Sequence, residues 1–152
     1  METVIDEINA AAKTLGLAAE ALRQLPPDES ERVYFAALHY FVSSGDRRWW
    51  WEDFREPGTS VMFESGDGWK LMPEIAPNPD EVVWFIAEED QLPHNPVFET
   101  TPRIASKIVG ECYGFEFYLI AKNFDWLLCE THHNRVCAVG PAVEQRLKGY
   151  AA

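Results

Sequence analysis

Residues 115–140, FEFYLIAKNFDWLLCETHHNRVCAVG, decide the fold of this chain. Apolar side chains recur at positions 115, 117, 119 and 121, which is the two-residue period of a strand with one face on a core. The runs DWLLCET and RVCAVG follow, and the polar HHN separates them as a hairpin turn would. The stretch therefore predicts three successive strands, of which the last two form a hairpin.

Two helices are expected before this sheet. Apolar residues at three- and four-residue spacing predict a helix over 3–25, with Thr3 as its N-cap and Gly16 as a point of interruption. Two prolines at 26 and 27 end it. A second helix, capped by Asp28 or Ser30, is then expected to run to about residue 42.

The middle of the chain favours strands. RWWWEDF (48–54), TSVMFES (59–65) and EVVWFIAEED (81–90) have strand composition, whereas the proline-rich segment 69–81 is expected to be irregular. Thr101 and Pro102 begin a mid-chain helix that ends at Gly110 or Gly114. A short helix over 141–150 closes the chain.

This order of elements predicts an α+β fold with a largely antiparallel or mixed sheet. The N-terminal helices, the mid-chain helix and the C-terminal helix are expected to pack on that sheet. With 152 residues, one domain is expected, with a helical part over about 3–42 and a sheet-containing part over about 47–140.

The net charge is −12, and most of it lies in the middle of the chain. Residues 49–101 contain twelve acidic residues and only two basic ones. Such a surface repels phosphate backbones, so nucleic acid is not an expected partner. The acidity either serves solubility alone or attracts a basic protein partner.

Nothing in the sequence points to a membrane. Apolar runs stay far below the roughly 18 residues of a membrane-spanning helix. METVIDEINA at the N-terminus lacks the features of a signal peptide, so a reducing, cytoplasmic location is expected. The odd count of three cysteines argues against a disulfide framework, and we expect free thiols.

Cys129, His132, His133 and Cys137 are the residues that most resemble a site of chemistry. Zinc takes four such ligands, but structural zinc sites draw them from two separated turns, whereas these four lie on one hairpin. Alternation along a strand puts His132 and His133 on opposite faces. We therefore expect core cysteines and turn histidines, with no metal, no cofactor and no catalytic residue.

Trp49, Trp50 and Trp51 form an unusual run. On a strand, Trp49 and Trp51 would face the core, and Trp50 would point the other way and be the candidate for an exposed role. Tryptophan is enriched at binding hot spots, so a contact surface is the alternative to core packing. Glu88, Glu89 and Asp90 are the acidic end of the strand expected at 81–90. They lack the spacing of a calcium loop, and a solvated strand end is expected.

Several of these stretches resemble a small bacterial family of uncharacterised domains that is similar to the SUKH superfamily. The resemblance runs from about residue 47 to residue 140, and it is carried by RRWWWEDF, EVVWFIAEED, the run at 96–99, FEFYLIAKNFDWLLCETHHN and VCAVG. The superfamily includes a yeast cell-wall synthesis regulator and many bacterial toxin-immunity proteins. It implies one α+β domain that acts by binding partners, without enzymatic activity or cofactor. This chain departs from the family pattern at Thr131 and Asn134, both in the turn.

We therefore predict a non-enzymatic, cytoplasmic domain that binds another protein. The partner could be a basic toxin domain. In that case the chain would be a toxin-immunity protein. The alternative is a small-molecule-binding or metal-dependent protein that uses the 129–137 hairpin. The predicted binding residues are Trp49, Trp50, Trp51, His132, His133, Asn134, Glu88, Glu89 and Asp90.

Overall fold

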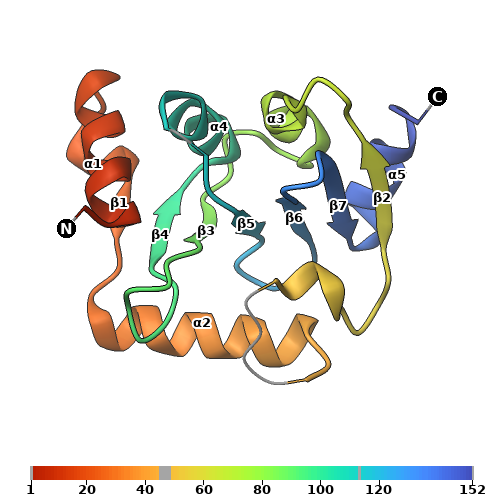
Figure 1. Ribbon diagram of the computed structural model, residues 1–152, viewed down its shortest axis with the longest axis horizontal. Helices are drawn as coiled ribbons and strands as arrows, with labels where there is room; N and C mark the ends of the chain where they lie inside the picture. Colours follow the sequence, from red (N-terminus) through yellow and green to blue (C-terminus); the bar gives the residue numbers. More distant parts are fainter. Residues whose placement is uncertain (1, 45–48, 113, 152) are drawn as a thin grey trace.

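In the part of the chain that the structure describes, seven antiparallel strands form a single sheet at the centre of the molecule (Figure 1). The structure is a computed structural model, and it describes residues 2–44, 49–112 and 114–151. Within those residues the strand order is β1-β4-β3-β5-β6-β7-β2. The strands are β1 (Arg23–Gln24), β2 (Thr59–Met62), β3 (Val83–Ala87), β4 (Val97–Thr100), β5 (Phe117–Ile120), β6 (Leu127–Glu130) and β7 (Arg135–Val139).

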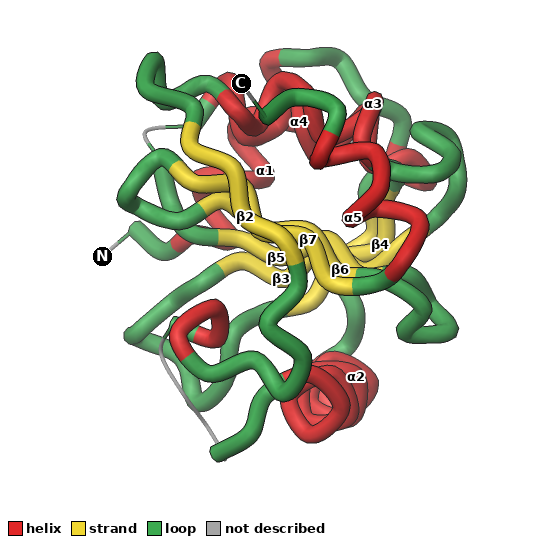
Figure 2. Tube along the Cα trace, turned by 90° about the vertical axis from the view of Figure 1, so that its right-hand side faces the viewer, coloured by secondary structure: helices red, strands yellow, loops and turns green. Residues whose placement is uncertain are grey.

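Helices cover both faces of the sheet, so the fold has three layers (Figure 2). Helix α2 and the 3₁₀ turn Trp50–Glu52 lie on one face, and α1, α3, α4 and α5 lie on the other. The α+β prediction is confirmed, and the sheet is antiparallel rather than mixed. The α-helices are α1 (Val4–Thr14), α2 (Pro27–Phe41), α3 (Met72–Ile75), α4 (Pro102–Glu111) and α5 (Pro141–Lys148).

Strand β5 shows how the sheet divides two cores. Phe117 and Leu119 join the core beneath the four-helix layer, as the two-residue period predicts. Tyr118 and Ile120 point the opposite way, into the core beneath α2. All four residues are buried, because helices cover both sides of the strand. The predicted hairpin is also confirmed, with Cys129 opposite Cys137 in the β6–β7 register.

The N-terminal helix is shorter than predicted. Its cap is confirmed: the Thr3 hydroxyl accepts a hydrogen bond from the Asp6 N–H, and the Asp6 carboxylate accepts one from the Thr3 N–H. The helix ends at Thr14, and Gly16 then adopts a positive φ of 67°. The predicted helix over 3–25 is therefore wrong beyond this point. A 3₁₀ turn (Ala19–Ala21) leads into strand β1, which pairs with β4 and extends the sheet into the predicted helical part.

The N-cap of helix α2 lies two residues before the predicted cap Asp28 and four before the alternative, Ser30. Pro26 is the N-cap, and neither Asp28 nor Ser30 caps the helix. Ser30 is instead buried inside α2, where its hydroxyl accepts a hydrogen bond from the Val97 N–H of β4. The side chain therefore ties the helix to the sheet.

The middle of the chain contains more helix than predicted. The predicted strand over 48–54 is wrong, because Trp50–Glu52 form a 3₁₀ turn; residues 47 and 48 lie outside the described part of the chain. The segment 69–81 is not wholly irregular, since a 3₁₀ turn (Gly68–Leu71) runs into α3. Thr101 caps α4 through the Ile104 N–H, as predicted. None of the described helices has the length and apolar character that a membrane crossing requires.

Candidate interaction site

Trp50 is the buried member of the tryptophan run, which reverses the predicted assignment. A 3₁₀ turn has three residues per turn, so neighbouring side chains do not alternate between two faces as they do on a strand. Trp50 is 0% exposed, and its ring stacks on Tyr118 with 4.7 Å between ring centroids. The Trp50 backbone N–H donates a hydrogen bond of 3.0 Å to the Tyr118 hydroxyl. Trp50 therefore anchors the turn in the core beneath α2.

Trp49 and Trp51, which precede and follow this anchor in the sequence, are both half-buried. Their rings are nearly parallel, at 28°, with centroids 6.2 Å apart. The exposed His132 ring lies 5.1 Å from Trp49 and 5.5 Å from Trp51. The His133 ring lies 5.8 Å from Trp51 and 4.0 Å from His132. We call these four residues the aromatic–histidine cluster.

The turn between β6 and β7 presents both histidines to the tryptophans. The buried Thr131 hydroxyl accepts hydrogen bonds from the His133 and Arg135 N–H groups. Asn134 closes the turn with a φ of 63°, a conformation that asparagine tolerates better than most residues. Because residues 132–134 lie outside the strand ladder, the predicted placement of His132 and His133 on opposite faces is wrong. Asn134 is exposed beside them, and its carbonyl accepts a hydrogen bond from the Phe63 N–H.

Glu116 connects the histidine turn to the sheet. One oxygen of its carboxylate accepts hydrogen bonds from the His132 N–H at 3.0 Å and from the His132 ring Nδ1 at 2.8 Å. The other oxygen is buried and has no hydrogen-bond donor among the described residues. The Glu116 carbonyl accepts a hydrogen bond from the Glu88 N–H, at the end of β3. The structure thus brings the tryptophan run, the histidine turn and the start of the acidic run to one end of the sheet.

Sequence reasoning missed Glu116, although a signal for it exists. In the antiparallel register of β5 and β6, Phe117 lies opposite Glu130. Glu116 therefore lies beside the first residues of the following turn. Once the three strands had been aligned by their apolar pattern, this neighbourhood could have been deduced.

A family model matches residues 2–151, nearly the whole chain, and it describes a family of unknown function, DUF6756. The chain belongs to the DUF6756 family. The match includes the aromatic–histidine cluster and both helical layers. No curated protein and no solved structure matches the chain. The family description names no activity, substrate or partner.

Glu89 has a structural position in this DUF6756 member. Its carboxylate accepts hydrogen bonds from the Val4 N–H, at the start of α1, and from the Gln91 N–H. Its own N–H donates to the Asn95 side chain. Glu89 therefore holds α1 and the loop after β3 together. Asp90 is exposed next to it.

The cysteines of the hairpin pack into the sheet. Cys129 is 1% exposed, and burial raises the pKa of its thiol well above the ordinary value. A hydrogen bond with Cys129, supported by Ser60 and by the nearby Arg135, lowers the pKa of Cys137. Among the described residues, no three His, Cys, Asp or Glu side chains are arranged to hold a metal ion. The raised pKa keeps the buried Cys129 thiol protonated at neutral pH, so Cys129 is poorly suited to act as a nucleophile.

Proposed function

We propose that this protein is a non-enzymatic interaction domain that binds a basic segment of a partner protein through the aromatic–histidine cluster. The observation that carries the proposal is the convergence of two half-buried tryptophans and two exposed histidines at one end of the sheet. Tryptophan combines a large apolar face with few rotatable bonds, and a few such residues usually dominate the binding energy of an interface.

The charge beneath the cluster favours a cation. Glu116 carries a buried carboxylate whose only described hydrogen-bond donors belong to His132. The carboxylate reaches the two indole rings through the His132 ring, which lies 5.1 Å from Trp49 and 5.5 Å from Trp51. A negative charge at this distance adds to the attraction of the indole faces for a guanidinium or ammonium group. The planar guanidinium of arginine suits this position best, because it stacks on an aromatic ring and keeps its hydrogen-bond donors free at its edge.

The acidity of the chain supports the same kind of partner. The net charge of −12 speeds the approach of a basic protein at low salt and opposes binding to nucleic acid. A basic toxin domain, neutralised in the cytoplasm, is the specific partner that the resemblance to the SUKH superfamily favours. The burial of Cys129, which raises the pKa of its thiol, supports the part of the proposal that assigns no catalytic role to this residue.

The first experiment captures partners from the native host on the immobilised protein. The matched baits are the wild type, a Trp49→Ala/Trp51→Ala variant, and a Trp69→Ala variant that loses a half-buried indole from the opposite face of the sheet. We expect one basic protein to be held by the wild type and by Trp69→Ala, and to be lost from the double variant. Its release between about 50 and 300 mM salt is expected, because charge contributes to the contact.

The second experiment decides the toxin-immunity form of the proposal. The captured partner is purified and its activity is measured with increasing amounts of wild-type protein. Stoichiometric inhibition by the wild type, with none by the double variant, is the expected result. Retention of the same basic protein by all three baits would instead show that the cluster is not the contact surface.

A further inference from the structure

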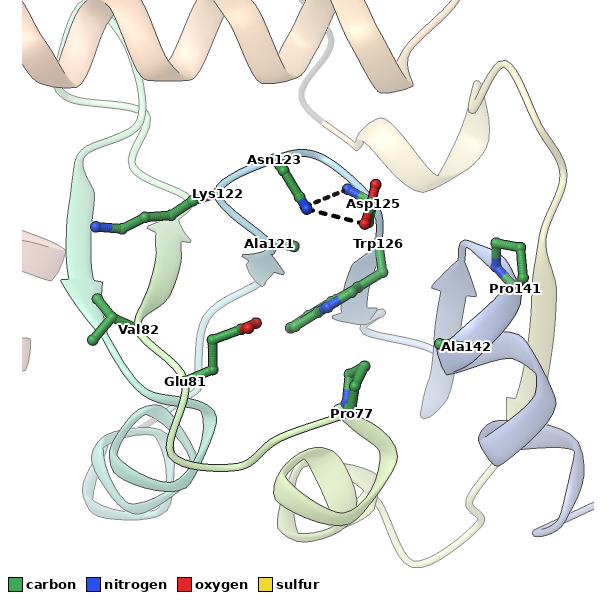
Figure 3. Close-up of a pocket in the computed structure, with 10 residues that line it drawn as sticks. All are labelled: Pro77, Glu81, Val82, Ala121, Lys122, Asn123, Asp125, Trp126, Pro141 and Ala142. Atoms are coloured by element: carbon green, nitrogen blue, oxygen red, sulfur yellow. Dashed lines mark hydrogen bonds between the residues drawn. The ribbon is translucent and has the colours of Figure 1, made fainter.

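A second site lies at the opposite end of the sheet, where a cavity of about 700 Å³ opens between the start of β3, the β5–β6 turn and the start of α5 (Figure 3). Glu81 and Val82 precede β3 and Trp126 precedes β6, whereas Glu88 and His132 of the first site follow those same strands. Cavities of this volume hold small molecules rather than protein segments. The site is therefore separate from the aromatic–histidine cluster.

Trp126 lies in the middle of the residues that line this cavity (Figure 3). The residue is only 4% exposed, and its indole projects between Glu81 and Asn123 (Figure 3). Pro77 lies on one side of the ring, and Val82 adds an apolar wall that is 46% exposed. An exposed valine beside a buried indole is a surface on which the apolar body of a ligand can pack.

The charges that face the cavity are negative. The Glu81 side chain points toward the Trp126 ring (Figure 3). Asp125 lies at the rim, where its carboxylate accepts a hydrogen bond from the Asn123 side chain at 3.0 Å. Lys122 also lines the cavity, but its ammonium group is bound to Glu99 and lies 4.6 Å above the centre of the Trp84 ring. The Glu81 carboxylate therefore faces the cavity and the Asp125 carboxylate lies at its rim, while the Lys122 ammonium group is held away by Glu99.

We propose that this cavity binds a small organic cation, a primary amine with an apolar body. The ammonium group pairs with Glu81 in the field of Asp125, and the apolar body packs on Trp126 between Pro77 and Val82. An anion would meet both carboxylates, and a neutral ligand would gain the apolar contact alone. The cavity is thus selective for charge as well as for shape.

The test uses three probes of nearly the same size: phenethylamine, 2-phenylethanol and 3-phenylpropanoate. Binding is followed by NMR through the indole N–H signals of the full-length protein, with the Trp126 signal assigned from a Trp126→Phe variant. We expect phenethylamine to shift the Trp126 signal with a dissociation constant of order 1 mM, and the alcohol to bind at least about fivefold more weakly. The carboxylate is expected to cause no saturable shift.

Two charge variants complete the test. Glu81→Gln keeps the shape of an exposed side chain and is expected to weaken phenethylamine binding about five- to tenfold. Glu64→Gln removes the same charge from an exposed position outside the cavity and is expected to change binding less than twofold. The proposal is overturned if phenethylamine leaves the Trp126 signal unmoved at about 20 mM, if the alcohol or carboxylate binds as tightly, or if both variants weaken binding equally.

Discussion

Replacement of Trp50 by alanine tests whether the middle tryptophan is the anchor of the run. The side chain is fully buried and stacks on Tyr118. Truncation removes roughly 150 Å² of buried apolar surface, worth about 4 kcal/mol at 25 cal/mol per Å², and it also removes the ring stack, worth about 1 kcal/mol. Partial collapse of the cavity offsets some of this loss, so we expect a cost of about 4 kcal/mol. For a chain of this length the melting temperature should fall by about 8–16 °C.

Urea unfolding followed by circular dichroism measures this cost without using tryptophan fluorescence, which the substitution itself changes. Trp50→Phe keeps a ring on Tyr118 and is the matched control, with an expected cost of about 1–2 kcal/mol. Trp49→Ala and Trp51→Ala are each expected to cost about 1 kcal/mol or less, because both side chains are half-buried. A cost below about 1.5 kcal/mol for Trp50→Ala, or an equal cost for Trp51→Ala, would refute the assignment of Trp50 to the core.

Three further predictions concern pH, backbone conformation and thiols. Burial raises the pKa of Glu130 to about 7, so the folded state holds a proton that the unfolded state has lost. The free energy of unfolding should therefore fall as pH rises from about 4.5 to about 7. The expected loss is roughly 1 kcal/mol, because solvent screens the partly exposed carboxyl group. Urea unfolding at several pH values measures this slope, and Glu130→Gln should remove it. Gly140→Ala should cost more than about 2 kcal/mol in urea unfolding, because φ is 116° and the added Cβ would lie 2.4 Å from a backbone oxygen; Gly16→Ala, with open space around it, should cost about 1 kcal/mol. Cys137 should react with a thiol reagent at pH 8 well before Cys129, as measured by mass spectrometry of the labelled peptides; equal rates would contradict the burial of Cys129.

The sequence predicts those elements whose signal is local. The period of two over 115–121 and the polar HHN turn specify β5, β6 and β7, and Thr101 with Pro102 specifies the start of α4. Strand β1 has only two residues, so no periodicity exists from which to predict it. The tryptophan run favours a strand by propensity, but the packing of Trp50 on Tyr118 draws it into a 3₁₀ turn.

The candidate site was predicted as separate pieces, and only long-range contacts join them. Trp51 and His132 are more than eighty positions apart in the chain, and no local pattern indicates that their rings meet. Glu116 was missed because its role depends on the strand register, which places its carboxylate beside the His132 N–H. The Trp126 cavity likewise depends on three separate segments that the sheet brings together.

The dissociation constant of the complex with the captured basic partner tests the central claim most directly. It should be measured by calorimetry for the wild type, the Trp49→Ala/Trp51→Ala variant and the Trp69→Ala control, each first shown to be folded. We predict that the double variant binds at least about thirtyfold more weakly, since a hot-spot tryptophan is worth 2 kcal/mol or more. The control should bind within twofold of the wild type. Equal affinity of the wild type and the double variant would contradict the account, because the aromatic–histidine cluster would then contribute nothing to the contact.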